Sequence, residues 1–185
     1  NLSIGQGFML STPLQLATAT AVLANRGKWV IPRLVKAINE EEVQGIESPQ
    51  DVVLKHEWYW DHILASMEEV MHGKRGTARA SGTDAPYRIA GKTGTAQVIA
   101  IKQGEEYDAE AIAEEHRDHG LFIGFAPVSD PKLALAVVVE NGGGGSSAAA
   151  PVARTIFDAY LLGKTEMVPD PMQPADVNTY TLVSQ

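Results

Sequence analysis

The chain of 185 residues contains no cysteine, which excludes disulfide bonds and thiolate chemistry from its fold and its function. Long apolar runs are absent as well. The longest, Leu133 to Val139, has the length of a strand and falls far short of the roughly 20 residues that a membrane-spanning helix needs. Neither a membrane span nor a signal peptide is therefore recognisable in this sequence.

Basic residues are the minority charge, with 15 lysines and arginines against 23 aspartates and glutamates and a formal net charge of -8. Because phosphate binding needs a clustered basic face and the cations here are scattered, we exclude nucleic acid as a partner. Acidic residues do cluster, and we interpret the clusters as solvated surface: Glu40 to Glu42, Glu68 and Glu69, and Glu105 to Glu115.

The overall composition, 44% hydrophobic and 21% charged, is that of a soluble globular domain. A domain of this length buries roughly 70% of the surface that its unfolded chain exposes. One domain, or most of one, is therefore expected.

Three segments carry helix signals. Thr12 and Gln15 have the spacing of a capping box with Pro13 at the first helical position, which predicts a helix from Pro13 to about Asn25 that ends at Gly27. Because this segment is apolar nearly all round, we expect it to be buried. Two more helices are predicted: one from His56 to His72 with Gly73 as its C-cap, and one from Pro151 to Leu162 that is capped by Ser146 or Ser147 and lies across the sheet.

Two strands are predicted near the C-terminus, Leu121 to Ala126 and Leu133 to Glu140, and the short turn between them makes the pair antiparallel. Seven apolar residues in a row from position 133 indicate that both faces of the second strand are covered, so we expect it inside the sheet with an upstream strand beside it. The other segments are an extended stretch from Trp29 to Ile38, a polar loop from Glu40 to Asp51 and a helix-prone insertion over residues 100–120.

No metal site and no cofactor are predicted. His56, His62 and His72 are too widely spaced for a cluster. His116, Asp118 and His119 are interpreted as exposed loop residues, because a metal site needs a closed and supported ligand shell. The segment from Gly73 to Thr77 has the glycines of a phosphate-binding loop, but no strand precedes it, and we interpret it as a turn.

The most informative segment is Ile89 to Val98, with Lys92-Thr93-Gly94-Thr95 at its centre. In a strand, Lys92 and Gly94 share one face while Thr93 and Thr95 share the other. Gly94 leaves room for another backbone, so an extended peptide could pair with this edge while the lysine and the hydroxyls hold a carboxylate. By itself, Lys92 would also fit a solvated edge strand whose charge discourages aggregation.

Lys-Thr-Gly is the third motif of the penicillin-binding proteins and serine β-lactamases. Its neighbours come in the order of one family, and the chain resembles the C-terminal half of a class B penicillin-binding protein transpeptidase domain, most like the cell-elongation subgroup, penicillin-binding protein 2. The segments that carry the resemblance are Ser3 to Gly7, Thr12 to Ala17, Ala90 to Gln97, Arg117 to His119 and Glu140 to Gly143.

The resemblance implies an α+β fold, an antiparallel sheet flanked by helices, of which this chain would supply three strands and the C-terminal helix. Residues 1–163 would be the C-terminal part of the domain and residues 164–185 an extended or disordered tail. The whole domain would be a serine D,D-transpeptidase that cross-links peptidoglycan stem peptides and is inhibited by β-lactams. Lys92, Thr93, Gly94 and Thr95 would bind the substrate; Lys92 and the Thr95 backbone N–H would serve catalysis, the latter in the oxyanion hole.

Half of the family's active site is missing from the sequence, which has no Ser-x-Asn motif. The literal Ser-x-x-Lys of Ser129 to Lys132 contains Pro131 and is interpreted as a turn between strands. The chain also begins at Asn1, so we expect a fragment that is inactive alone and needs the upstream half of its domain.

Other partners implied by the resemblance are stem peptides, β-lactams, and the glycosyltransferase and scaffold of an elongation complex. The implied location is the periplasmic face of the bacterial inner membrane, with the anchor upstream of this chain. Two alternatives stay open: a non-catalytic β-lactam sensor or degenerate binding module, and a D,D-carboxypeptidase or division-type transpeptidase.

Overall fold

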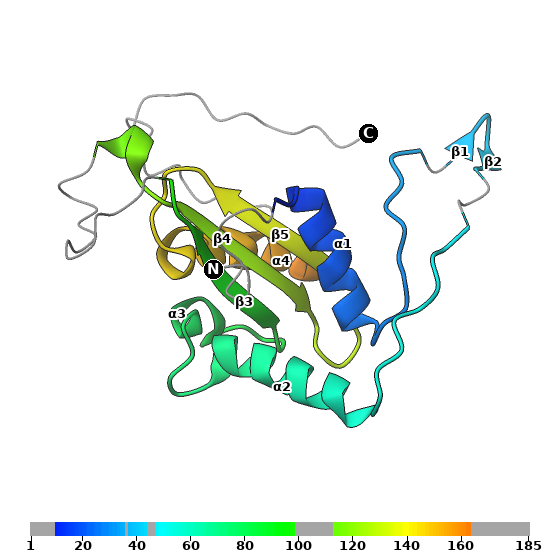
Figure 1. The fold of residues 1–185 in the computed structure, drawn as a ribbon, viewed down its shortest axis with the longest axis horizontal. Coiled ribbons are helices and arrows are strands. Elements are labelled where there is room, and N and C mark those ends of the chain that lie inside the picture. Colours follow the sequence, from blue (N-terminus) through cyan, green and yellow to red (C-terminus); the bar gives the residue numbers. More distant parts are fainter. Residues whose placement is uncertain (1–9, 36, 44–46, 99–112, 164–185) are drawn as a thin grey trace.

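A computed structural model describes residues 10–35, 37–43, 47–98 and 113–163 and has an α+β fold, as predicted (Figure 1). Its helices are α1 (Pro13–Ala24), α2 (Trp58–His72), α3 (Arg79–Gly82) and α4 (Ala150–Leu162). Its strands are β1 (Ala37–Ile38), β2 (Glu41–Glu42), β3 (Ala90–Ala96), β4 (His119–Ala126) and β5 (Leu133–Val139). Two single turns complete the description, a 3-10 turn at Glu114–His116 and a π turn at Gly145–Ala149.

Strands β3, β4 and β5 form one antiparallel sheet in that order. The central strand β4 pairs Ile123 with Lys92 on one side and with Ala136 on the other. The predicted antiparallel sheet with three strands is therefore confirmed, and the Lys-Thr-Gly strand lies at its edge within the part of the chain that the structure describes.

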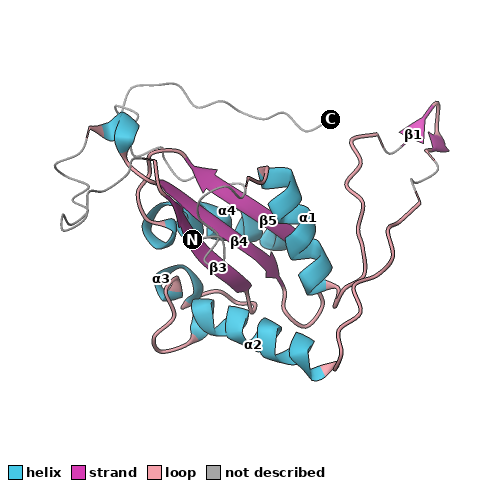
Figure 2. Cartoon of the chain, in the orientation of Figure 1, coloured by secondary structure: helices cyan, strands magenta, loops and turns pink. Residues whose placement is uncertain are grey.

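Helices cover both faces of this sheet (Figure 2). One cluster of buried side chains joins α1, α2 and one face of the sheet: Ala24, Met67, Ala90 and Phe125. The larger cluster joins α4, α2 and the opposite face: Met71, Ala78, Ile89, Phe122, Ala126, Leu135, Ala149, Ala150, Ala153 and Phe157. Helix α2 contributes to both clusters because it runs along the β3 edge of the sheet. No helix among the described residues has the length and apolar character to cross a membrane.

Helix α1 begins where its sequence predicts. The Thr12 N–H donates to Gln15 Oε1 at 2.8 Å and the Gln15 N–H donates to Thr12 Oγ1 at 3.2 Å, which is the reciprocal capping box. The helix ends with the Gly27 N–H donating to the Val22 carbonyl at 2.9 Å. The expectation of full burial was wrong, because Leu14 remains 60% exposed and only the side of the helix that faces the sheet is covered.

Three other expectations need correction. The segment before Asp51 contains the two-stranded hairpin β1–β2, although glutamates at positions 41 and 42 gave no strand signal. Strand β4 begins at His119, two residues earlier than predicted, since His119 and Gly120 continue the ladder with β3. Neither Ser146 nor Ser147 caps α4 with its side chain, because the π turn Gly145–Ala149 leads directly into the helix.

Both faces of strand β5 are covered, as its apolar run indicates, and the cover comes from this chain's own helices α1 and α4. The strand also lies at an edge of the described sheet and not inside it. Among the described residues no strand pairs with its outer side, and Val138 is 36% exposed there.

We expect residues 1–185, expressed alone, to self-associate, because an uncharged apolar edge strand offers unpaired backbone groups to other chains. Sedimentation velocity at several concentrations would measure this. Val138→Lys, which adds a charge at the edge, should reduce association, whereas Ala19→Lys on the exposed surface of α1 should not. A soluble monomer with a sharp cooperative thermal transition would contradict the expectation.

Candidate active site

The four residues of the Lys-Thr-Gly-Thr segment lie on β3 with exposed or half-buried side chains. Lys92 Nζ donates to the carbonyl of Thr93 at 2.6 Å. The Thr93 hydroxyl lies on the other face of the strand, 3.0 Å from the hydroxyl of Thr77. A Cβ added to Gly94 would meet only Leu121 Cβ, at 3.4 Å. The predicted alternation of faces is therefore present, and the surface above Gly94 is open to an approaching backbone.

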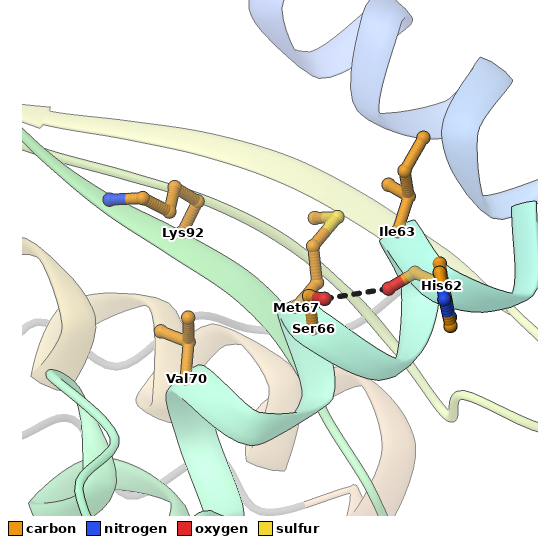
Figure 3. A pocket seen from close by; sticks show the side chains of 6 residues that line it. All are labelled: His62, Ile63, Ser66, Met67, Val70 and Lys92. Carbon is orange, nitrogen blue, oxygen red and sulfur yellow. Dashed lines mark hydrogen bonds between the residues drawn. The ribbon is translucent and has the colours of Figure 1, made fainter. Parts of the chain in front are cut away.

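A pocket of about 420 Å³ separates Lys92 from helix α2 (Figure 3). Met67 and Val70 point from the helix toward the strand, and His62, Ile63 and Ser66 complete the lining. Ser66 donates its hydroxyl proton to the His62 carbonyl at 2.7 Å. The lysine thus stands beside a mainly apolar wall, where a charge interacts more strongly with an anion than it does in open water.

The chain that leads into β3 is held at three successive residues. The Tyr87 hydroxyl donates to Asp158 of α4 at 2.5 Å. Arg88 Nε donates to Glu68 of α2 at 2.5 Å, and the Ile89 N–H donates to Nε2 of His72 at 2.9 Å. Helix α4 on one face of the sheet and helix α2 along the β3 edge therefore fix where the strand starts.

Two pKa values report on this anchoring. Burial, with the hydrogen bond to Asp158 as the second cause, raises the pKa of Tyr87 well above its ordinary value. Burial, aided by the positive charge of Arg88, lowers the pKa of His72. Neutral His72 is the form that can accept the Ile89 N–H, so the shift and the hydrogen bond favour the same state.

The strand is also supported from behind by the π turn. A Cβ added to Gly145 would lie 2.2 Å from the Leu121 carbonyl oxygen and 2.4 Å from that of Gly94, so only glycine fits this contact. The run of glycines from Gly142 to Gly145, which follows β5, places its last member directly against the centre of the Lys-Thr-Gly strand.

Asp118, His119 and Asn141 form a junction that sequence reasoning missed. Asp118 and His119 were expected to be exposed loop residues, but Asp118 is 8% exposed and His119 opens β4. The Asn141 N–H donates to Nδ1 of His119 at 2.9 Å, and Asn141 Nδ2 donates to the carbonyls of Glu115 and Arg117 at 3.0 and 3.1 Å. Within the described part of the chain, no three His, Cys, Asp or Glu side chains gather as a metal site would require.

The literal Ser-x-x-Lys at Ser129 to Lys132 is a turn, as predicted. The Lys132 N–H donates to the Ala126 carbonyl at 3.0 Å, and Lys132 Nζ pairs with Asp130 at 2.6 Å. No helix presents the serine and lysine on one face. The segments from Ser3 to Gly7 and from Ala100 to Ile112 lie outside the described residues, as does the tail that begins at Lys164.

Lys92 lies on an open sheet edge beside apolar side chains, and the motifs around it are those expected of a penicillin-binding protein transpeptidase domain. Comparison with known families agrees with this class of protein. The family "Penicillin binding protein transpeptidase domain" matches residues 1–158, and the chain belongs to this family. Peptidoglycan D,D-transpeptidase MrdA of Haemophilus influenzae is 42% identical over 164 residues, covering 87% of this chain and 25% of the relative. The chain thus spans about a quarter of the length of the curated relatives it matches.

Solved structures of penicillin-binding protein 2 share the fold. The protein from Pseudomonas aeruginosa in complex with WCK 5153 is 44% identical with a TM-score of 0.76, covering 94% of this chain and 34% of that one. The Helicobacter pylori protein in complex with MreC is 31% identical with a TM-score of 0.67, covering 88% and 27%. One chain of a further structure, on the coordination of polymerization and crosslinking by a peptidoglycan synthase complex, also shares the fold; it is 30% identical with a TM-score of 0.67, covering 90% of this chain and 26% of that one. The resemblance to penicillin-binding protein 2 is therefore confirmed.

The His72 contact predicts a pH-dependent stability. Since the folded pKa lies below the unfolded value of about 6.5, stability is fully present above that value and is lost as the pH falls through it toward the folded pKa. In the complete protein, His72→Gln should flatten this dependence between pH 7.5 and 5, as measured by urea unfolding. His56→Gln, at an exposed position, is the control, and equal slopes for wild type and His72→Gln would refute the assignment.

Gly145→Ala should displace β3, because the new methyl group cannot fit against two carbonyl oxygens. Forced overpacking of this kind costs roughly 1–3 kcal/mol. Thermal unfolding of the complete protein should show the loss, and the rate of acylation by penicillin should fall with it. Ser146→Ala at the adjacent exposed position should leave both measurements unchanged; equal behaviour of the two variants would mean that the turn does not support the strand.

Proposed function

We propose that this chain is the C-terminal part of a peptidoglycan D,D-transpeptidase that cross-links stem peptides during cell elongation through a serine acyl-enzyme. The observation that carries the proposal is Lys92 on an open strand edge beside an apolar wall, in a chain 42% identical to a D,D-transpeptidase MrdA. This identity favours the elongation enzyme over a carboxypeptidase, a division-type transpeptidase or a non-catalytic sensor. A β-lactam would enter the same site as the stem peptide.

In this mechanism, a serine from the upstream half attacks the carbonyl between the two D-alanines of a stem peptide. The C–N bond breaks and D-alanine leaves, which gives an ester on the serine. An amine from a second stem then attacks the ester, forms the cross-link and releases the serine. Each step passes through a tetrahedral oxyanion that needs hydrogen-bond donors.

The residues of β3 have distinct roles in this proposal. The backbone of the stem peptide lies along the strand where Gly94 leaves room. Thr93 and Thr95 donate hydrogen bonds to its terminal carboxylate, and Lys92 supplies positive charge to that carboxylate and to the serines. The N–H of Thr95 is one donor of the oxyanion hole, whose loss typically slows catalysis roughly 10²- to 10³-fold.

The partners follow from the same assignment. The upstream half of the domain would cover the apolar pocket between α2 and Lys92 and bring the serine to the strand. Residues 1–163 then form the end of the domain and residues 164–185 a tail outside it. A scaffold partner is supported by the MreC complex of the Helicobacter pylori relative, and a glycosyltransferase partner by the related synthase complex. The proposed location is the periplasmic face of the inner membrane.

Lys92→Ala in the complete protein should slow acylation by a fluorescent penicillin about 10²- to 10³-fold, because a charge in the reacting site is lost. An exposed strand lysine contributes under about 0.5 kcal/mol to stability, so thermal unfolding should not change. Lys55→Ala, at an exposed position remote from β3, is the matched control. Residues 1–185 alone should remain unlabelled. Acylation at the wild-type rate in a folded Lys92→Ala protein would remove this lysine from the site.

A further inference from the structure

The segment from Gly73 to Thr77, interpreted above as a turn and not as a phosphate-binding loop, lies against the Lys-Thr-Gly strand. Its last residue, Thr77, is exposed and places its hydroxyl oxygen 3.0 Å from that of Thr93. The two residues are 16 positions apart in the chain, so local sequence patterns do not reveal the pair. The contact joins the proposed carboxylate-binding hydroxyl to a second hydroxyl that no motif includes.

The position of Thr77 is fixed by the end of helix α2. The Gly73 N–H donates to the Glu69 carbonyl at 2.9 Å, and the Ala78 N–H donates to the Val70 carbonyl at 3.0 Å. Between them, a Cβ on Gly76 would lie 2.4 Å from the Val70 carbonyl oxygen, so glycine lets the turn close directly on the helix. The backbone on both sides of Thr77 is therefore anchored, so its side chain starts from a fixed position beside Thr93.

A hydroxyl group has one proton to donate and can accept two hydrogen bonds. When Thr93 donates its proton to a carboxylate, its bond with Thr77 can persist only if Thr77 is the donor. A hydrogen bond donated by Thr77 would fix the rotation of the Thr93 hydroxyl, so that the proton of Thr93 points toward the anion. It would also strengthen the bond from Thr93 to the anion, because hydrogen bonds in a chain polarise one another. Lys74 and Arg75 precede this position as exposed cations, and Arg75 lines a shallow pocket together with Thr77 and Glu69.

We propose that Thr77 is a positioning residue for the transpeptidase reaction: its hydroxyl orients the hydroxyl of Thr93 toward the carboxylate at the end of the substrate. The inference rests on the proposed function and deepens it by assigning a residue outside the three motifs to carboxylate recognition. Since the carboxylate is held alike in the ground state and the transition state, Thr77 acts on substrate binding more than on the chemical step.

The test uses the complete protein and acylation by benzylpenicillin, followed as saturation kinetics. Thr77→Val, which keeps the shape and removes the hydroxyl, should raise the half-saturation concentration about tenfold, the net worth of one neutral hydrogen bond, with the limiting acylation rate nearly unchanged. Thr77→Ser should restore wild-type behaviour. Wild type and Thr77→Val should bind the methyl ester of the same penicillin equally well, because the ester has no carboxylate toward which the Thr93 hydroxyl could be oriented.

Two controls separate positioning from a structural role. Thr83→Val removes an exposed hydroxyl on the same stretch of chain, one that donates to the Arg79 carbonyl at 2.7 Å, and should have no effect on acylation. Thr77→Val added to Thr93→Val should cause no further loss, because its effect passes through Thr93. A lower melting temperature with equal losses for the acid and the ester would show a structural role and overturn the proposal.

Failure of this inference differs from failure of the proposed function. If Lys92→Ala abolishes acylation while Thr77→Val matches wild type with benzylpenicillin, the strand is the active site and only the role of Thr77 is wrong. If Lys92→Ala also matches wild type, the assignment of the site itself is wrong, and the role of Thr77 falls with it.

Discussion

The register between β3 and β4 is the constraint on which the candidate site depends. Lys92 lies opposite Ile123, and this pairing turns its side chain toward α2. A slip of one residue would exchange the two faces of the strand and move the lysine to the side that Thr93 now occupies. An edge strand has only one ladder to prevent such a slip, because its other edge must stay open for a peptide. The additional support comes from residues 87–89 at its start and from Gly145 behind its centre.

Helix α2 provides much of this support through residues spaced one turn apart. Glu68 and His72 hold the segment that enters β3, Met67 packs beneath the sheet, and the carbonyl of Val70 receives the turn that carries Thr77. Because all these contacts come from one rigid element, a shift of the helix would move the start of the strand, the pocket wall and the threonine pair together. The site is in this sense built on a helix and a strand, and not on loops.

The sequence predicts some parts of this arrangement and not others. The difference is the separation along the chain between the residues that form each feature. Capping residues such as Thr12 and terminal glycines such as Gly73 act within one turn, and the helix ends they predict agree with the structure. The short turn after Ala126 predicts antiparallel pairing for the same reason. Lys92 was found through the order of motifs along the chain, which carries information that periodicity does not.

The features that sequence reasoning missed depend on contacts between distant residues. Thr77 and Thr93 are 16 positions apart, and His119 and Asn141 are 22 apart, so neither pair leaves a periodic pattern. The π turn before α4 is shaped by the close contact of Gly145 with β3, which no capping rule describes. The hairpin β1–β2 forms with glutamates in one of its strands, against their intrinsic preference.

The hydrogen bond from the Val98 N–H to Asp118 Oδ1, at 3.2 Å, joins the two ends of the segment between β3 and β4. Asn141 reinforces the same point by bonding the carbonyls of Glu115 and Arg117. The bond between Val98 and Asp118 closes the end of the backbone ladder between β3 and β4. Lengthening a loop whose two ends are already joined adds little entropic cost. A change in the length of the connection after Val98 should therefore leave the register of the Lys-Thr-Gly strand intact, because Asp118 and Asn141 hold the flanking residues together without it.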